Sequence, residues 1–323
     1  MKSPIKSLLL GLFSAVSLIS AAEAADKYPS RPIRVVVMFP AGGSADVVGR
    51  LVTQKVSDMS GFNFVVENRP GAGGNLALDT VATAAPDGYT VVFATPGIAI
   101  NPSLYEKVPY KLEDFRAISL VGEAPLMFLA RPSLGVKSIT HLVEMSKRAP
   151  DAIRFGSSGN GSSSHLAAEV LRTMTGMQYL HVPYKGGGAA MADVVGGQTD
   201  MTVQPISESL PFIRDQRLQA LGQTGTKRSP IAPDVPTIAE AGVEGYASTT
   251  WYLLAAPAKV PQEIVDTLAE KFSQALRQPD LQQKLQNVGV TTINAGPAKA
   301  EEFLKSEATR WETLIKKAGI RLQ

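Results

Sequence analysis

The chain has 323 residues, of which 44% are hydrophobic and 19% are charged, and it contains no Cys. This composition excludes a collagen-like, a disulfide-stabilised or a wholly disordered polypeptide, and it predicts two ordinary domains. Lys and Arg number 32 against 29 Asp and Glu, a formal net charge of +3, and no segment concentrates the basic residues. We therefore expect no nucleic-acid partner.

The first 24 residues have the order of a secretory signal peptide. Lys2 and Lys6 precede an apolar run from Ser7 to Ile19. Ala22 and Ala24 are small residues at the positions that a signal peptidase reads. The run is shorter than the roughly 20 residues needed to span a bilayer. We expect cleavage after Ala24 and a freely diffusing periplasmic protein; the alternative is an uncleaved membrane anchor.

Apolar runs alternate with helical patterns in the first hundred residues. Runs rich in β-branched residues, typical of strands buried on both faces of a sheet, lie at Ile33 to Phe39, Phe62 to Val66 and Thr90 to Ala94. Between them, apolar residues at helical spacing predict helices at 47–59, which Gly61 ends, and at 76–84. This alternation predicts a mostly parallel sheet with helices on both faces.

The same alternation begins again after two extended connections, at 117–120 and 126–130. Helical spacing predicts helices at Ile139 to Lys147, capped by Ser138, and at Ser162 to Met174. Shorter helices fit residues 191–195 and 207–214, and strands fit residues 153–156, 179–183, 200–203 and 218–222.

The C-terminal part carries predicted helices without strands of their own. An extended run, Tyr246 to Ala256, precedes a helix that Pro261 opens and a long helix, from about Phe303, that ends at Gly319. Such helices need a sheet to cover, so we infer that this block returns to the first domain. The chain then crosses twice between the domains, beside a cleft and a hinge. The alternative is two sequential, independent domains.

Residue types that catalysis or metal binding would need are not grouped. His141, His165 and His181 lack the paired spacing of a metal site. Ser164 and His165 are adjacent and would point about 100° apart on a helix, so adjacency does not make a Ser–His dyad. The dinucleotide fingerprint and the phosphate-loop motif are also absent. We expect no cofactor, no metal and no enzymatic activity.

Two loops rich in Gly and Ser each run from a predicted strand into a helix. They are Phe39 to Asp46 and Gly156 to His165. Gly lets the backbone approach a ligand closely, and a helix start offers unpaired N–H groups to an anion. Open α/β sheets bind ligands at this end of their strands. We expect the loops to face each other across a cleft and hold one carboxylate; the alternative is two tight turns, with Ser as N-cap and Asp46 as a first-turn acid.

Short motifs along the whole mature chain resemble the tripartite tricarboxylate transporter receptors, also called Bug receptors. The motifs are Tyr28 to Ile33 (YPSRPI), Pro40 to Asp46, Glu67 to Asn75, Pro86 to Thr90, Asn101-Pro102, Gly156 to His165, Val182 to Gly186, Pro233 to Thr237 and Glu240 to Gly242. The resemblance implies an α/β, two-lobed periplasmic binding protein of type II, a Venus flytrap with two α/β domains, a hinge and an interdomain cleft. The expected limits are 1–24 for the signal peptide, 25–125 plus 249–323 for domain 1 and 126–248 for domain 2.

The resemblance also implies a function. Such a receptor closes over a small carboxylate and presents it to the membrane subunits of a tripartite tricarboxylate transporter. We expect this chain to do so as a monomer. Two other functions stay open: a periplasmic ligand sensor that signals to a membrane partner, and a periplasmic enzyme that acts on carboxylic acids through Asp46 or Asp200.

The residues that the resemblance assigns to the ligand lie mainly in the two loops, and ordered water often completes the contacts. Where members that bind amino acids offer an Asp, this chain has Gln204. A neutral Gln cannot balance an ammonium group, so a mono- or dicarboxylate without an amino group is favoured. Phe39, Pro96 and Trp251 are candidates for a partly apolar rim, with a core position as the alternative for Trp251. A bulky side chain in place of Gly43 should keep the ligand from approaching the backbone, and it would be unfavourable if φ is positive at this position. The full set of expected ligand-binding residues is Phe39, Ala41, Gly42, Gly43, Ser44, Ala45, Asp46, Thr95, Pro96, Ser157, Ser158, Ser162, Ser163, Ser164, Gln204 and Trp251.

Overall fold

The computed structural model describes residues 28–150 and 152–318. Contacts within the chain separate a short unit that ends at Arg31 from a compact unit that begins at Pro32. The described part of the short unit contains no helix or strand. The predicted signal peptide with its cut after Ala24, and the predicted helix end at Gly319, lie outside the described residues. The fold below is that of the unit from Pro32 on.

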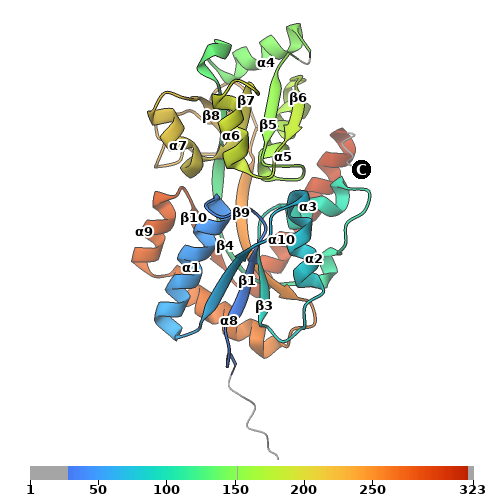
Figure 1. Ribbon diagram of the computed structural model, residues 1–323, viewed down its shortest axis with the longest axis vertical. Coiled ribbons are helices and arrows are strands. Elements are labelled where there is room, and N and C mark those ends of the chain that lie inside the picture. Colours follow the sequence, from blue (N-terminus) through green and yellow to red (C-terminus); the bar gives the residue numbers. More distant parts are fainter. Residues whose placement is uncertain (1–27, 151, 319–323) are drawn as a thin grey trace, which may run out of the picture. The chain divides into compact units, whose positions relative to one another are not determined.

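Strands of this unit form a ten-stranded sheet within the described residues (Figure 1). Along the sheet the order is β2 (Phe64–Asn68), β1 (Ile33–Val37), β3 (Thr90–Ala94), β9 (Thr249–Pro257), β4 (Phe115–Ala130), β7 (Met201–Pro205), β5 (Arg154–Ser157) and β6 (Leu180–Pro183). Two further strands, β10 (Thr291–Ala295) and β8 (Gln219–Gln223), also pair with β4.

The long strand β4 belongs to both lobes of the fold. Its first part pairs with β9 and β10, and its last five residues, Leu126 to Ala130, pair with β7 and β8. The two extended connections expected at 117–120 and 126–130 are therefore wrong as connections, because they are parts of one strand. We call the side with β1 the lower lobe and the side with β5 the upper lobe, as they stand in Figure 1.

The sheet is mixed, so the expectation of a mostly parallel sheet is wrong at its centre. Parallel pairing holds within each predicted βαβ series, between β1 and its neighbours β2 and β3, and between β5 and its neighbours β6 and β7. Strands β4 and β9 run antiparallel to each other and to the strands beside them. The pair therefore joins two parallel half-sheets, one in each lobe.

Helices cover both lobes, and those predicted from the sequence are present, whereas α3 and α9 were not predicted. The lower lobe has α1 (Ser44–Ser60), α2 (Asn75–Ala82), α3 (Gly97–Leu104), α8 (Gln262–Leu276), α9 (Pro279–Asn287) and α10 (Pro297–Ala318). The upper lobe has α4 (Ile139–Arg148), α5 (Ser163–Thr175), α6 (Gly187–Val195) and α7 (Ile206–Arg214). Helix α1 buries Val48, Val52 and Val56 on one face and ends, as predicted, at Gly61 with a φ of 75°. The predicted cap Ser138 accepts a hydrogen bond from the N–H of His141.

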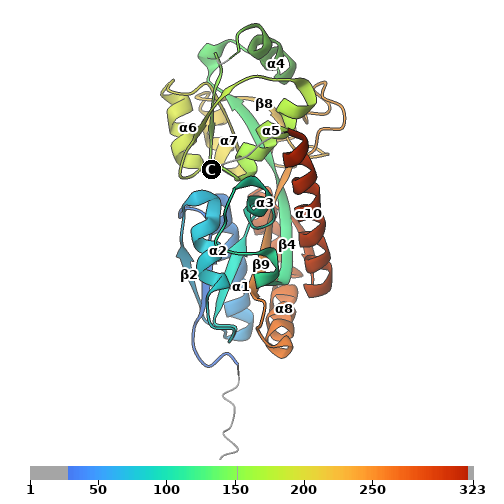
Figure 2. The ribbon, with the colours of Figure 1, turned by 90° about the vertical axis from the view of Figure 1, so that its right-hand side faces the viewer.

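The C-terminal block lies with the lower lobe. Helix α8 contacts α1, and α10 contacts β4 and α3. Figure 2 shows α10 running along β4 and reaching the upper lobe, where it contacts α5. The block has its own strand, β10, so the inference that its helices lack a strand is wrong. Contacts from Pro32 on form one compact unit, and the predicted domain limits stay a prediction.

Each lobe has its own core. The lower core contains Val36, Val92 and Leu253, and the upper core contains Phe128 and Phe155. Two cores joined by β4 and β9 agree with a two-lobed α/β fold. Among the described residues, no helix has both the length and the apolar character needed to cross a membrane.

Candidate functional site

A cavity of about 580 Å³ lies between the lobes, beside the ends of the parallel strands. Its size is in the range of pockets that hold small molecules. Most of the expected ligand-binding residues line it: Phe39, Ala41, Gly42, Gly43, Ser44, Ala45, Thr95, Ser158, Ser162, Ser163, Ser164 and Gln204. The structure therefore brings both Gly- and Ser-rich loops to one cavity.

The first loop, between β1 and α1, is held in shape by Asp46. Asp46 Oδ2 accepts a hydrogen bond from the N–H of Gly42 at 2.9 Å. Its Oδ1 accepts from Arg50 Nε at 2.8 Å and from Asn68 Nδ2 at 3.0 Å. Burial opposes ionisation, but these hydrogen bonds outweigh it and keep the pKa of Asp46 below its usual value. Asp46 does not line the cavity, and its structural alternative as a first-turn acid describes it better than ligand binding.

Backbone angles in this loop correct the expectation for Gly43. Gly42 has a φ of +81°, whereas Gly43 has a φ of −73° and precedes α1. A penalty for positive φ therefore applies at Gly42 and not at Gly43. The alternative of a Ser N-cap is also wrong here, because α1 begins at Ser44 and no side chain caps it. Its first N–H groups have no partner inside the helix and can serve a ligand.

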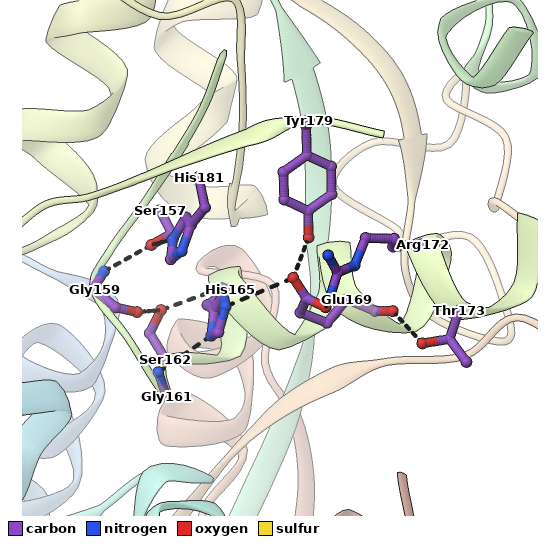
Figure 3. Close-up of polar contacts among 10 residues, drawn as sticks. All are labelled: Ser157, Gly159, Gly161, Ser162, His165, Glu169, Arg172, Thr173, Tyr179 and His181. Carbon is purple, nitrogen blue, oxygen red and sulfur yellow. Dashed lines mark hydrogen bonds and ion pairs between the residues drawn. The ribbon is translucent and has the colours of Figure 1, made fainter. Parts of the chain in front are cut away.

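The second loop, between β5 and α5, is held by its own polar groups (Figure 3). Ser162 caps α5, since its Oγ accepts from the N–H of His165 at 3.2 Å. The same Oγ donates to the carbonyl oxygen of Gly159 at 2.6 Å. Ser157 Oγ accepts from the N–H of Gly159 at 3.1 Å. Ser157 is buried within the loop and does not line the cavity.

Behind this loop, His165 and His181 stack with ring centroids 4.3 Å apart. His165 Nδ1 accepts from the N–H of Gly161 at 3.3 Å, and His181 Nε2 lies 2.7 Å from Ser157 Oγ. Burial lowers the pKa of His165 to about 3 and that of His181 to about 4, so both rings are neutral at pH 7. The pair therefore supports the loop (Figure 3). Over residues 28–150 and 152–318, no cluster of three or more acidic or His side chains could hold a metal ion.

Polar side chains of the upper lobe that line the cavity form hydrogen bonds with each other and with Thr250. Ser158 Oγ donates to Gln204 Oε1 at 2.7 Å, and Gln204 Nε2 donates to Ser164 Oγ at 3.5 Å. Ser163 Oγ donates to Thr250 Oγ1 on β9 at 3.0 Å. The proton of Ser163 is thus directed to Thr250, whereas the hydroxyl of Ser164 accepts here and can donate its proton to a ligand.

Two expected rim residues lie elsewhere. Trp251 is 1% exposed, and its Nε1 donates to Glu307 Oε2 at 3.0 Å. Its ring packs edge-on against Phe303 of α10. Pro96 is buried at the start of α3. Neither residue lines the cavity, and Trp251 takes the alternative position in the lower core.

Other residues that line the cavity were not predicted. They are Pro40, Leu126, Lys185, Gly186, Gly187, Gly188, Ala189, Met191, Pro205, Glu208, Phe212 and Thr250. The run from Lys185 to Gly188 follows a predicted strand and precedes a predicted helix, so it carries the same signal as the two loops. Leu126, Glu208 and Thr250 carry no local signal, because tertiary structure alone brings them to the cavity.

Two of the contacts between the lobes are hydrogen bonds near the cavity. At one, Tyr105 of the lower lobe donates to the carbonyl oxygen of Asn160 at 3.3 Å, and the backbone of Gly73 approaches Asn160 closely. At the other, the N–H of Ser44 donates to Glu208 Oε1 of α7 at 2.6 Å. Both contacts join the lower lobe to the upper lobe.

Comparison with known proteins shows that the chain is similar to one family of receptors and to solved structures of periplasmic binding proteins. Residues 48–320 match the family described as tripartite tricarboxylate transporter family receptor. The chain is 34% identical to Rpa4515 of Rhodopseudomonas palustris, solved with adipate, with a TM-score of 0.87 over 91% of this chain and 100% of that one. It is 33% identical to the periplasmic binding protein BugD, with a TM-score of 0.86 over 91% of this chain and 100% of that one. It is also 31% identical to MatC from Rhodopseudomonas palustris with bound malate, with a TM-score of 0.84 over 89% of this chain and 100% of that one. The resemblance and the two-lobed fold predicted from the sequence are thereby confirmed.

Proposed function

The chain belongs to the tripartite tricarboxylate transporter receptor family, and on this premise we propose that it captures a small carboxylate between its lobes and delivers it to the membrane subunits of such a transporter. The observation that carries the proposal is that the starts of α1 and α5 line one cavity. The N–H groups and the dipole at a helix start attract an anion. The adipate of Rpa4515 and the malate of MatC support a carboxylate as the ligand.

The proposed ligand is a mono- or dicarboxylate without an amino group. Backbone N–H groups at Ser163 and Ser164 hold its carboxyl oxygens, directly or through ordered water. The start of α1 is open to a carboxylate that displaces Glu208 from the N–H of Ser44. Gln204 faces the cavity as a neutral side chain that is already hydrogen bonded to Ser158. Phe39 adds an apolar surface at the rim.

We propose export with cleavage after Ala24, action in the periplasm as a monomer, and movement of residues 126–248 against the rest of the chain. We also propose binding without turnover. Asp46 and Asp200, the acids considered for catalysis, are both engaged with Arg side chains outside the cavity.

A thermal-shift screen over mono-, di- and tricarboxylates tests the function. A ligand that binds only the folded state raises the melting temperature, so we expect at least one acid of the panel to raise it. Calorimetric titration then gives its Kd, and mass spectrometry of the recovered acid tests for turnover. The proposal is contradicted if no carboxylate raises the melting temperature or binds, and binding without turnover is contradicted if product accumulates.

Ser164→Ala and Ser163→Ala form a matched pair of variants in the second loop. We expect Ser164→Ala to weaken binding about tenfold, since it removes a hydroxyl donor to a charged group. Ser163→Ala should cost less, because its hydroxyl proton is directed to Thr250. Calorimetric titration of both variants against the parent measures the difference. Equal affinity of both variants and the parent would show that neither hydroxyl reaches the ligand.

A further inference from the structure

A carboxylate of the chain itself occupies one of the two helix starts. Glu208 lies in the first turn of α7 in the upper lobe. Its Oε1 accepts the N–H of Ser44, the first residue of α1 in the lower lobe, at 2.6 Å. The contact crosses the cavity, and both residues line it. Glu208 therefore takes the position in which α1 would hold the carboxylate of a ligand.

In the part of the chain that the structure describes, the charge of Glu208 is not balanced by an ion pair, although Lys185 also lines the cavity. Within the described residues no basic side chain forms an ion pair with it, and its hydrogen-bond donor is Ser44. Its second oxygen lies against Gly187, where an added Cβ would be 2.8 Å from Oε2. Burial raises the pKa of Glu208. Its negative charge is held mainly by the helix start, which is the interaction that a bound anion would use.

A second buried group lies beside this contact. The hydroxyl of Tyr252 has no hydrogen-bond partner among the described residues, although the side chain is buried. Burial is the main cause of the raised pKa of Tyr252, and the charge of Glu208 adds to the rise. Because Glu208 Oε1 lies 2.6 Å from the nitrogen of Ser44, the charge of Glu208 lies at the start of α1, where a second anion would have to lie.

We infer that Glu208 sets the selectivity of the cavity between acids with one carboxylate and acids with two; this inference rests on the proposed function. The start of α5, with Ser163 and Ser164, remains for the carboxylate of a monocarboxylate, which leaves Glu208 in place. A dicarboxylate that spans both helix starts must displace Glu208 or lie beside its charge. Like charges about 4 Å apart in a partly buried site repel strongly. The cavity therefore favours a monocarboxylate over the dicarboxylate of equal length.

Two pairs of acids test the inference: hexanoate with adipate, and butyrate with succinate. The members of each pair have the same carbon chain and differ in one terminal carboxylate. Calorimetric titration of the parent and of Glu208→Gln gives the ratio of dicarboxylate to monocarboxylate affinity. We expect Glu208→Gln, which keeps the size and an acceptor oxygen but removes the charge, to raise this ratio about tenfold or more. Glu208→Ala should shift the ratio in the same direction. It replaces the Gln variant in the test if that variant does not fold.

The control is Glu244→Gln, an exposed position in the same lobe that loses the same charge. We expect this control to keep the parental ratio. The inference is overturned if both Glu208 variants are folded and keep the parental ratio for both pairs, or if the control shifts the ratio equally. If carboxylates of the wider panel bind but the ratio does not change, selectivity has another origin and the proposed function stands. If no carboxylate binds the parent or any variant, the proposed function itself fails.

Discussion

Replacing Gly73 by Ala is expected to weaken carboxylate binding by about thirtyfold, because a methyl group at this position stops the lobes from closing. Gly73 lies in the lower lobe with a φ of +62°, and a Cβ on it would lie 2.2 Å from the carbonyl oxygen of Asn160 in the upper lobe. That oxygen belongs to the backbone, so it cannot move aside as the end of a flexible side chain can. A packed interface does not absorb such an overlap. We expect the lobes to stay apart and the ligand to lose contact with one helix start.

Gly61→Ala is the matched control for this variant. Gly61 has a φ of +75°, and a Cβ there would meet nothing within 4 Å. It therefore carries the same backbone cost, about 1 kcal/mol, without the overlap between lobes. Calorimetric titration measures affinity, and small-angle X-ray scattering shows whether the lobes close on the ligand. We expect parental affinity for Gly61→Ala, and parental affinity for Gly73→Ala would mean that closure at this contact does not contribute to binding.

The elements that were predicted correctly are those with a strong signal in their own local sequence. Strand β3 has the predicted bounds, and α1 ends at the predicted Gly61, because buried strands and left-handed helix ends leave strong local signals. Strand β4 was divided, since Glu123 and Pro125 interrupt its apolar run; pairing with β9 along its length makes it continuous. Strand β10 has several exposed or polar residues and depends on its pairing with β4, which no local pattern reveals.

The site was predictable as far as it consists of loops that follow buried strands. Ser44 and Ser163 were found in this way. Thr250 and Trp251 show the limit, because they are neighbours on β9 and successive strand residues point to opposite faces. Thr250 lines the cavity, whereas Trp251 enters the lower core. Which of the two faces the ligand depends on how β9 pairs in the sheet, and the sequence does not contain that information in local form. Glu208 was missed for the same reason, since α7 brings it to α1 from 164 residues away.

Asp200→Ala is expected to lower the free energy of unfolding by about 3 kcal/mol, because it removes the acceptor at the centre of a buried charge cluster. Asp200 is 2% exposed and directly precedes β7. Its Oδ2 accepts the backbone N–H of Arg154 at 2.7 Å, and its Oδ1 accepts from Arg131 Nε at 2.9 Å. The side chains of Arg131 and Arg154 are 26% and 40% exposed. Water therefore replaces part of the lost interaction, which places the loss at the lower end of the range for a broken buried ion pair.

The loss of stability in Asp200→Ala should become smaller as the pH falls. Burial opposes ionisation of Asp200, but hydrogen bonds from Arg154 and Arg131 outweigh it and hold its pKa below the usual value. A carboxylate with a lowered pKa stabilises the fold fully above its unfolded pKa, near pH 4, and this contribution is lost as the pH falls through the folded pKa. Urea unfolding of the parent and of Asp200→Ala should show the full difference at pH 7 and a smaller one at the lowest pH at which the parent stays folded.

The control is Asp215→Ala, an exposed position in the same lobe, which should change the free energy of unfolding by less than about 0.5 kcal/mol. A difference below about 1 kcal/mol at pH 7, or one that grows in acid, would contradict the stabilising role of the Asp200 carboxylate.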